Sequence, residues 1–333
     1  MRNQAAPEPT FKEQQQLLPS QVTKVITVTL HPAFDRTVEL DGLEPERVNR
    51  VLHERLDPGG KGVNVSRVLT AFGVSNTALV LAGRSNLPIY RHLLQKEQVN
   101  GVYLPIEGAI RENTTFVLPD HRILKVDKAG AQAGASVIPA VEYALGEQLI
   151  DREHTVVVFS GSLPPGLTGD LLVGLISGLT QVRVAVDTAS LTLQQLLQCK
   201  PWLIKPNIHE LRALTDRPLK ERREIVAAAR GLVKAGIENV LVSLGEDGLL
   251  LIDSEQAVQA VPPAVEVRST VGAGDSALAG FLFAKSKPLP NEQAGGVAAA
   301  FGTAAVMTEG TNAPRKEDVS ALLKKVAVQK MLF

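Results

Sequence analysis

The segment TVGAGD at positions 270–275 combines small residues with one carboxylate, and a helical pattern, SALAGFLFAK, follows it. Small residues let the backbone turn tightly, so the N–H groups of Ala273, Gly274 and Asp275 can converge on a phosphate at a helix N-terminus. Asp275 would then lie beside a bound phosphoryl group, where a carboxylate can accept the proton of an attacking hydroxyl. The segment predicts phosphoryl transfer with Asp275 as the base, its pKa held low by the helix dipole.

The TVGAGD segment is also compatible with a dinucleotide site or with a purely structural turn. Gly272, Gly274 and Ala277 fit the dinucleotide-binding pattern Gly-x-Gly-x-x-Ala, which has little specificity on its own. That fingerprint should open the first strand–helix–strand unit of a chain, whereas this segment lies near the end, which disfavours a dehydrogenase. A glycine-rich helix start with a capping Asp would have no chemical role at all.

A second glycine cluster, DPGGKGVN at positions 57–64, precedes another helical pattern. It differs from a nucleotide-binding P-loop, because Gly62 replaces the Ser or Thr that must follow Gly-Lys. A lysine and an asparagine presented at a glycine turn can instead bind a sugar hydroxyl and a phosphate, and an ordinary loop is the alternative. The residues concerned are Gly59, Gly60, Lys61 and Asn64.

Ser160 begins the segment SGSLPPG, which follows the apolar run VVVF. If that run is a strand of a parallel sheet, Ser160 lies at a carboxyl end, where α/β proteins bind ligands. A serine nucleophile in a Gly-x-Ser-x-Gly turn is disfavoured, because Pro164 occupies the place of the final glycine and no partner among the six histidines is evident. Ser160 is therefore a candidate substrate-binding residue.

Lys205, Asn207 and Glu210 lie in the segment KPNIHE, which follows a strand-like run and begins a helix. Residues three apart share one face of a helix, so Asn207 and Glu210 can together hold Mg²⁺ against nucleotide phosphates. The alternative is a helix cap, with Asn207 as the N-cap and Glu210 as the third residue of a capping box.

The segment SLGEDG closes the apolar run NVLV. A tight glycine turn at the end of a strand suits a nucleotide ribose or phosphate, and it suits a β-hairpin equally well. Its residues are Ser243, Leu244, Gly245, Glu246, Asp247 and Gly248.

These motifs lie between alternating strand and helix patterns. Short apolar runs indicate buried strands at positions 22–30, around Val158, around Val184 and up to Gly245, and helical patterns separate them. This order predicts an α/β fold with three layers, α/β/α, around a mainly parallel central sheet. In such a fold, ligand sites gather at the carboxyl ends of the strands.

Two regions, at about 35–55 and 111–128, break the alternation. The second contains NTTFVLPDHRILKVDK, whose two apolar-rich arms around a Pro-Asp turn predict a β-hairpin. Strand pairs inserted into an α/β chain indicate a small sheet, which we expect to act as a lid over the site. We expect one domain over residues 21–333 and a disordered extension over residues 1–20, which are polar and contain prolines.

The composition argues against several classes of protein. Lys plus Arg equals Asp plus Glu at 35 each, so no broad positive field would attract nucleic acid or an anionic membrane. The single cysteine, Cys199, excludes an internal disulfide and fits a reducing compartment. No apolar run approaches the about 20 residues that cross a bilayer. We therefore expect a cytoplasmic protein that binds neither nucleic acid nor membrane.

Five segments, DPGGKGVNVSRVL, SGSLPPG, LIKPNIHEL, VSLGEDG and STVGAGDS, together resemble the ribokinase-like (PfkB-type) carbohydrate kinases in sequence and in order. The likeness spans about residues 25–312 and is greatest to the branch of fructose-1-phosphate kinase, tagatose-6-phosphate kinase and the minor 6-phosphofructokinase. It implies a ribokinase-like fold, ATP and Mg²⁺ as cofactors, and a small sugar phosphate as substrate. It also implies a homodimer formed through the lid.

The resemblance further implies a role for each matching residue, with Gly272, Ala273 and Gly274 as the anion hole and Asp275 as the catalytic base. The implied substrate-binding residues are Asp35, Gly59, Gly60, Lys61, Asn64, Arg111, Asn113, Ser160 and Asp275. The implied nucleotide-binding residues are Lys205, Asn207, Ser243, Leu244, Gly245, Glu246, Asp247, Gly248, Gly274 and Asn312, and the implied metal-binding residues are Asn207 and Glu210.

Three positions depart from the family pattern: His31 replaces the usual Asn, Ile110 replaces the common Thr before Arg111, and residues 84–87 read RSNL where a glycine-rich stretch is expected. All three fall on the sugar side, so they bear on the choice of sugar phosphate. The expected reaction converts fructose 1-phosphate to fructose 1,6-bisphosphate. The alternatives are tagatose-6-phosphate kinase or 6-phosphofructokinase activity and, from another class, a non-catalytic sugar-phosphate sensor.

Overall fold

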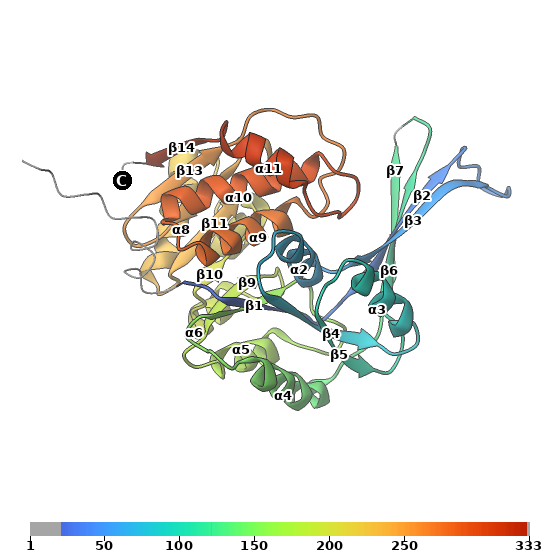
Figure 1. Cartoon of the computed structure of the whole chain (residues 1–333), viewed down its shortest axis with the longest axis horizontal. Coiled ribbons are helices and arrows are strands. Elements are labelled where there is room, and N and C mark those ends of the chain that lie inside the picture. The colour runs from blue at the N-terminus through green and yellow to red at the C-terminus, as the bar shows by residue number, and fades with distance from the viewer. Residues whose placement is uncertain (1–20, 121, 332–333) are drawn as a thin grey trace, which may run out of the picture.

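The computed structural model describes residues 21–120 and 122–331, which form one large and one small sheet (Figure 1). The extension expected to be disordered, residues 1–20, lies outside the described residues. The large sheet has ten strands in the order β14-β13-β12-β11-β10-β9-β8-β1-β4-β5. Their bounds are β1 (Lys24–Thr29), β4 (Asn76–Gly83), β5 (Gly101–Ile106), β8 (Thr155–Ser160), β9 (Arg183–Asp187), β10 (Leu203–Ile204), β11 (Asn239–Ser243), β12 (Leu249–Ile252), β13 (Ala257–Val261) and β14 (Ala327–Met331).

The strands from β11 to β5 pair in parallel, which confirms the mainly parallel sheet. Strand β8, TVVVFS, is buried at every position, as β-branched strands covered on both faces are. Strands β12, β13 and β14 add an antiparallel edge, of which only the hairpin between β11 and β12 was among the interpretations of the sequence.

Helices cover both faces of the sheet, so the predicted α/β/α layering is confirmed (Figure 1). Helices α2, α9, α10 and α11 pack on one face, and α4 to α8 pack on the other. None of the described helices is both long and apolar enough to cross a membrane. The bounds are α2 (Lys61–Ala71), α3 (Leu87–Lys96), α4 (Ile138–Gln148), α5 (Gly169–Ser177), α6 (Leu193–Cys199), α7 (Ile208–Thr215), α8 (Arg222–Lys234), α9 (Ala273–Ser286), α10 (Asn291–Val306) and α11 (Lys316–Leu323), with short 3₁₀ turns at Ala135–Val137 and Gly245–Asp247.

Small residues bring α9 and α10 close together over the sheet. Gly280 of α9 faces Phe301 of α10 so closely that a Cβ at Gly280 would lie 2.7 Å from the Cβ of Phe301. An alanine at position 280 would therefore displace a fully buried aromatic ring. This close contact fixes α9, whose first turn contains part of the TVGAGD segment, against α10.

The small sheet has the order β3-β2-β6-β7, with bounds β2 (Ala33–Leu40), β3 (Val51–Gly59), β6 (Arg111–Val117) and β7 (Ile123–Asp127). It projects from the body of the molecule, and we call it the lid (Figure 1). The predicted hairpin is the antiparallel pair β6 and β7, and both regions that broke the alternation contribute strands. Phe34 and Tyr90 anchor the base of the lid by an edge-to-face contact, with ring centroids 5.4 Å apart.

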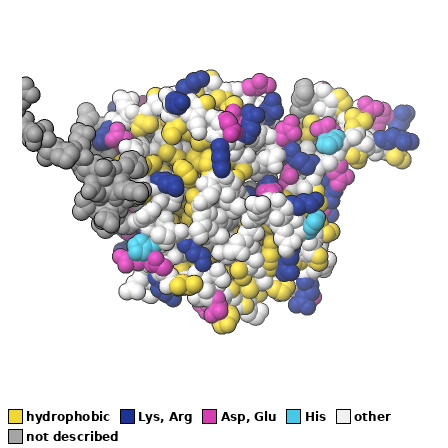
Figure 2. Space-filling view, viewed as in Figure 1, with side chains coloured by type: hydrophobic (Ala, Val, Ile, Leu, Met, Phe, Trp, Pro, Cys, Tyr) yellow, Lys and Arg dark blue, Asp and Glu magenta, His cyan; other side chains and the backbone are white. Residues whose placement is uncertain are grey.

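The side chains at the carboxyl ends of the parallel strands share one edge of the large sheet. Thr29 ends β1, Ser160 ends β8, Asp187 ends β9, Lys205 follows β10 and Ser243 ends β11. The lid joins the same edge, since β2 follows β1 and β3 leads into α2. On the face drawn in Figure 2, acidic and basic side chains are interspersed over the core and the lid, without one broad charged field.

Candidate active site

Asp275 lies in the first turn of α9, where it is buried and 6% exposed. Gly272 precedes the helix with φ +79, a left-handed conformation that a residue with a Cβ adopts only with strain. The Nδ2 of Asn64 on α2 donates a 2.8 Å hydrogen bond to Oδ2 of Asp275. The two glycine clusters, DPGGKGVN and TVGAGD, are therefore joined through these side chains.

The expectation that the helix dipole keeps the pKa of Asp275 low is wrong. Burial and the neighbouring charge of Asp187 raise the pKa to about 6, and they outweigh the hydrogen bond from Asn64 and the charges of Lys61 and Lys205. A dipole at a helix end contributes at most about 2 kcal/mol, which full desolvation of a carboxylate exceeds. A carboxylate with a pKa near 6 is a better proton acceptor than an ordinary aspartate.

Asp187 forms ion pairs with both lysines of the site, Lys61 and Lys205, although it lies in none of the predicted motifs. Its Oδ1 lies 3.1 Å from Nζ of Lys61, and its Oδ2 lies 3.3 Å from Nζ of Lys205. Although burial favours the neutral acid, Lys205 and Lys61 lower the pKa of Asp187. A signal was present, since a carboxylate ends the buried run VRVAVD, and such positions lie at the ligand-binding edge.

Lys61 lies closer to the phosphoryl-transfer residues than we expected. Its expected role in binding the sugar phosphate stays a prediction, and its ion pair within the protein is with Asp187. Burial opposes the charge on Lys61, yet the carboxylates of Asp187, Asp275 and Glu210 outweigh it and raise the pKa of Lys61. Lys61 is therefore a firmly protonated cation among three acids.

Asn207 and Glu210 form the capping box that was the alternative interpretation of their segment. Asn207 Oδ1 accepts from the Glu210 N–H at 2.9 Å, and Glu210 Oε2 accepts from the Asn207 N–H at 2.8 Å. The capping interpretation is confirmed, and the magnesium interpretation stays a prediction. No cluster of three or more His, Cys, Asp or Glu side chains suited to a metal occurs in the part of the chain that the structure describes.

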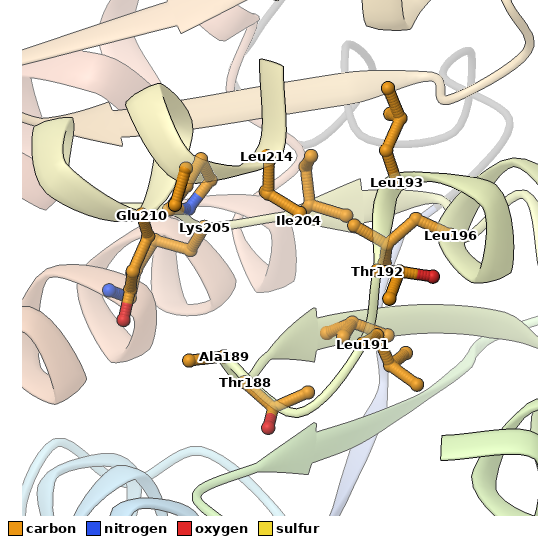
Figure 3. Close-up of a pocket in the computed structure, with 13 residues that line it drawn as sticks. Thr188, Ala189, Leu191, Thr192, Leu193, Leu196, Ile204, Lys205, Glu210 and Leu214 are labelled. Atoms are coloured by element: carbon orange, nitrogen blue, oxygen red, sulfur yellow. The ribbon is translucent and has the colours of Figure 1, made fainter. Parts of the chain in front are cut away.

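A cavity of about 250 Å³ adjoins Lys205 and Glu210 (Figure 3). Its wall is mainly aliphatic, with Leu191, Leu196 and Leu214 among the lining residues. This lining does not suit a triphosphate. The ammonium group of Lys205 lies instead beside Gly274, where a Cβ would be only 3.1 Å from Nζ.

The turn from Ser243 to Gly248 is both a hairpin and a neighbour of the KPN segment. It connects the antiparallel strands β11 and β12, and Gly245 and Gly248 have φ +65 and φ +82. The Ser243 N–H donates to the carbonyl of Pro206 at 3.1 Å. The structure thus brings the predicted nucleotide turn next to Asn207 at the strand ends.

The predicted sugar-side residues Asp35, Asn113 and Gly59 also lie together. Asn113 Nδ2 donates to Asp35 Oδ1 at 2.9 Å, and a Cβ at Gly59 would overlap the Asp35 carboxylate. Burial and the charge of Asp57 raise the pKa of Asp35, against the hydrogen bond from Asn113 and the charge of Arg111. Burial also disfavours the charged form of Arg111, and it therefore lowers the pKa of that side chain.

Several buried polar atoms on this side have no protein partner. They indicate a polar ligand, because buried donors and acceptors are almost always hydrogen-bonded in the complete site. Gly60, at φ +115, brings the turn over Thr29, whose methyl group would lie 2.9 Å from a Cβ at position 60. The unpartnered atoms are Thr29 Oγ1, Asn64 Oδ1, Arg111 Nε, Asn113 Oδ1 and Ser160 Oγ.

His31, one of the three departures from the family pattern, joins the core to the chain that follows β7. Its Nε2 lies 2.9 Å from the carbonyl of Ala129, and its Nδ1 lies 3.0 Å from Oγ of Ser162. Since a carbonyl can only accept, Nε2 carries the proton and Nδ1 accepts from the Ser162 hydroxyl. Burial and the charge of Arg111 lower the pKa of His31, which keeps the imidazole neutral.

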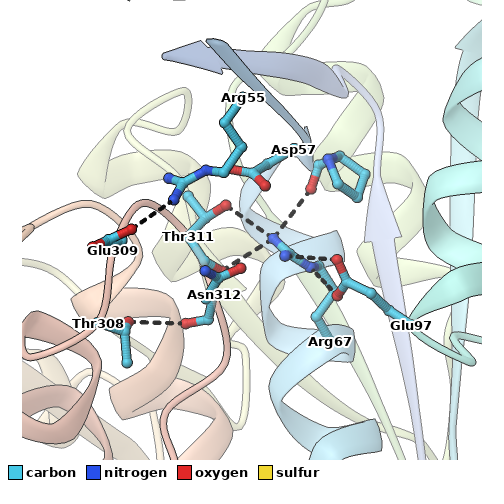
Figure 4. A network of polar contacts seen from close by, with 9 residues as sticks. Arg55, Asp57, Arg67, Glu97, Thr308, Glu309, Thr311 and Asn312 are labelled. Atoms are coloured by element: carbon cyan, nitrogen blue, oxygen red, sulfur yellow. Dashed lines mark hydrogen bonds and ion pairs between the residues drawn. The ribbon is translucent and has the colours of Figure 1, made fainter. Parts of the chain in front are cut away.

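Asn312, the last predicted nucleotide residue, is exposed in the loop before α11. Its carbonyl accepts from the Thr308 hydroxyl at 3.3 Å (Figure 4). The adjacent Thr311 is buried and packs against Gly272, where a Cβ would lie 3.8 Å from the Cα of Thr311. The loop therefore borders the expected anion hole.

The sequence matches a family described as pfkB family carbohydrate kinase over residues 28–318. A protein named 1-phosphofructokinase from Vibrio cholerae is 32% identical over 92% of this chain and 96% of its own length. A 1-phosphofructokinase from Rhodobacter capsulatus is 34% identical over 92% of this chain and 98% of its own.

The fold is similar to that of phosphofructokinase-2 from Escherichia coli, solved in complex with substrates and products. That structure has a TM-score of 0.84 and 30% identity, and the match covers 90% of this chain and 98% of the other. The same Escherichia coli protein has been solved with fructose-6-phosphate and in a tetrameric inhibited form.

Proposed function

We propose that this chain, which belongs to the pfkB family of carbohydrate kinases, transfers the γ-phosphoryl group of ATP to the C6 hydroxyl of fructose 1-phosphate. The products would be fructose 1,6-bisphosphate and ADP. The observation that carries the proposal is the buried Asp275, which Asn64 holds at the start of α9 within reach of the charges of Lys61 and Lys205. The choice of sugar is supported by the 1-phosphofructokinase relatives, which are more than 30% identical.

Asp275 takes the proton of the C6 hydroxyl in this mechanism. As the hydroxyl oxygen bonds to the γ-phosphorus, the bond from that phosphorus to the ADP oxygen breaks. Asn64 aims the carboxylate, since its N–H occupies Oδ2 and leaves Oδ1 toward the substrate. Because the transition state of phosphoryl transfer is loose, positioning contributes more than the strength of the base.

Backbone N–H groups of Ala273, Gly274 and Asp275 stabilise the charge on the transferring group. They lie in the first turn of α9, where the N–H groups have no helical partner and the dipole favours an anion. Lys205 supports them, since its ammonium group lies beside Gly274. Lys61, between Asp187 and Asp275, is placed to neutralise a phosphate that passes between donor and acceptor.

On the other side, Asp35 and Asn113 bind sugar hydroxyls, and Arg111 binds the phosphate that the sugar already carries. The unpartnered Arg111 Nε and Asn113 Oδ1 support these roles, because a sugar phosphate supplies both an acceptor and donors. The nucleotide lies along the turn from Ser243 to Gly248.

In this proposal Glu210 would hold Mg²⁺, and Asn207 would orient Glu210 through the capping box. The donors fit that ion, because Mg²⁺ keeps several waters and uses only one or two protein carboxylates together with substrate phosphates. Glu210 Oε2 and Asn207 Oδ1 are engaged in the capping box, so coordination directly or through water would fall to the remaining oxygen of Glu210. When bound, the ion would supply charge neutralisation of the triphosphate.

The main rival is 6-phosphofructokinase activity, which the likeness to Escherichia coli phosphofructokinase-2 favours. It requires the acceptor hydroxyl at C1 and the anchoring phosphate at the opposite end of the sugar, as tagatose-6-phosphate kinase activity also does. The deciding experiment measures ADP release with fructose 1-phosphate, fructose 6-phosphate and tagatose 6-phosphate. A higher kcat/KM with either 6-phosphate would overturn the proposed substrate, and binding without ADP release would indicate a sensor.

We further propose that two copies of the chain associate through the lid. Strands β3 and β7, the two edge strands of the lid, carry apolar side chains that are between 42% and 65% exposed, and exposed apolar surface at sheet edges favours association with another chain. These side chains are Val51, Leu52, Ile123, Leu124 and Val126.

Sedimentation velocity tests the association. Leu52→Asp should shift a wild-type dimer to monomer, whereas Ile150→Asp, at an apolar position that is 90% exposed outside the lid, should not. A wild-type monomer at micromolar concentration would contradict the proposal.

A further inference from the structure

Two arginines connect the loop 308–312 to the sugar side of the site (Figure 4). The first, Arg67 of α2, has a side chain only 1% exposed and forms an ion pair with Glu97. Its Nη1 donates to both the carbonyl and the hydroxyl of Thr311, at 3.0 and 2.9 Å, and to the carbonyl of Pro58 at 3.3 Å. One guanidinium therefore holds the loop and the residue before Gly59.

The second arginine, Arg55, reaches the same loop from lid strand β3. Its Nε donates to Asp57 Oδ2 at 2.8 Å, and its Nη1 lies 3.6 Å from Oε2 of Glu309. The guanidinium also covers Gly310, where a Cβ would overlap it and where φ is +59. Any side chain at position 310 would therefore displace Arg55 as well as strain the backbone.

We call these contacts of Arg55 and Arg67 between the lid side and the loop 308–312 the bridge. Each end of the bridge lies next to a residue of the proposed reaction. On the lid, Asp57 lies directly opposite Asp35 in the pairing of β2 and β3, and its charge raises the pKa of Asp35. On the loop, Thr311 packs against Gly272 of the anion hole. A continuous series of contacts thus joins Gly272 to Asp35 through the loop 308–312, Arg55 and Asp57.

We propose that Arg55 is a positioning residue that couples nucleotide binding to the position of the lid, by joining lid strand β3 to the loop beside the anion hole. The inference rests on the proposed assignment of residues 272–275 to the nucleotide. A nucleotide at the anion hole orders the loop, and the ordered loop presents Glu309 and Gly310 to Arg55. The lid strand is then held over the sugar site before the sugar phosphate arrives.

Linkage makes this coupling reciprocal. If the nucleotide orders part of the surface that the sugar phosphate also needs, each ligand binds more tightly in the presence of the other by one common factor. Arg67 contributes to the same bridge, but its buried ion pair makes it a poor first target, since loss of a partner there destabilises the fold. Arg55, with 27% of its side chain exposed, can be replaced with less risk.

Amide hydrogen exchange of the full chain tests the inference without a sugar, using a non-hydrolysable ATP analogue with Mg²⁺ at fixed protein concentration. In the wild type, the analogue should slow exchange at residues 272–275, at the loop 308–312 and at lid strand 51–59. Arg55→Gln should keep the first two effects and lose the third. The matched control is Arg36→Gln, because Arg36 pairs with Glu54 and Glu112 inside the lid.

The outcomes separate this inference from the proposed reaction. The inference is overturned if the analogue slows amide exchange of strand 51–59 equally in the wild type and in Arg55→Gln. It is also overturned if exchange of this strand is not slowed in the wild type, even when turnover is normal. No slowing at residues 272–275 would overturn the nucleotide assignment as well.

A binding measurement adds a second readout. The affinity for the sugar phosphate that turns over fastest should rise about fivefold or more with ADP bound in the wild type, and less than about twofold in Arg55→Gln. Arg55→Lys should lose the coupling as Arg55→Gln does, because a single ammonium group cannot contact Asp57 and the loop at the same time. Full coupling in Arg55→Gln would overturn the inference.

Discussion

The Nδ2 of Asn64 donates a 2.8 Å hydrogen bond to Oδ2 of Asp275 and joins helices through residues that lie 211 positions apart in the chain. The position of the base therefore depends on the glycine turn that begins α2, as well as on its own helix. Both residues are buried, so neither side chain has another orientation readily available.

Asp275→Asn should lower kcat by about 10²–10⁴-fold, because an amide cannot accept the hydroxyl proton. The affinity for the sugar phosphate should stay within about twofold, since Asn64 still has an oxygen to donate to. Steady-state kinetics and calorimetric titration measure the two effects. Turnover near that of the wild type would remove Asp275 from its role.

The same substitution should stabilise the folded protein at pH 7. The pKa of the buried Asp275 is raised from 3.8 to about 6 in the folded state. The free energy of unfolding therefore falls as the pH rises between those two values, because the carboxyl group ionises more readily in the unfolded chain. Removing this charge should add about 1–3 kcal/mol to the free energy of unfolding at pH 7 and little at pH 4. Urea denaturation at both pH values measures the difference, and equal effects at both would contradict the raised pKa.

The pH dependence of kcat/KM should report the ionisation of Asp275. Since only the carboxylate accepts a proton, kcat/KM should rise with pH up to about 6 and level off above it. Asn64→Leu removes a donor that favours the charged form, so the rise should move to higher pH by about one unit. An unchanged profile in Asn64→Leu would show that this hydrogen bond does not tune the base.

Asp187→Asn should destabilise the protein by about 3–5 kcal/mol, because it leaves the 5%-exposed ammonium of Lys205 without its partner. It should also move the acid side of the kcat/KM profile to lower pH, since the charge of Asp187 raises the pKa of Asp275. Asp151→Asn is the control, as Asp151 is an exposed acid near His154. Similar stability losses in both variants would refute a structural role for the buried pairs.

Gly59→Ala should raise the KM for the sugar phosphate by about tenfold or more and leave the KM for ATP nearly unchanged. The added Cβ would overlap the carboxylate of Asp35, so that the side chain must leave its position beside Asn113. Gly146→Ala is the control, because a Cβ at that helical position meets no atom within 4 Å. A similar increase in both KM values would indicate a general distortion instead.

Much of the site could be predicted from short segments, because it depends on residues that are neighbours in the chain. The left-handed Gly272, the start of α9 and the capping box of Asn207 and Glu210 are local features of this kind. The alternation of strand and helix predicted the parallel sheet, and with it the edge that collects Ser160, Lys205 and Ser243. In the antiparallel edge, the glycine turn between β11 and β12 gave a local signal, whereas β13 and β14 had none.

The sequence by itself determined which segments turn, where helices begin and which family of kinases the chain resembles. Only the tertiary structure decided that Asp187 pairs with both lysines, that Arg67 holds the loop at Thr311 and Arg55 holds it at Glu309, and that the pKa of Asp275 is raised. The physical reason is that burial and charge act through space. They sum over residues far apart in the chain, whereas turns and caps depend on backbone angles over a few consecutive residues.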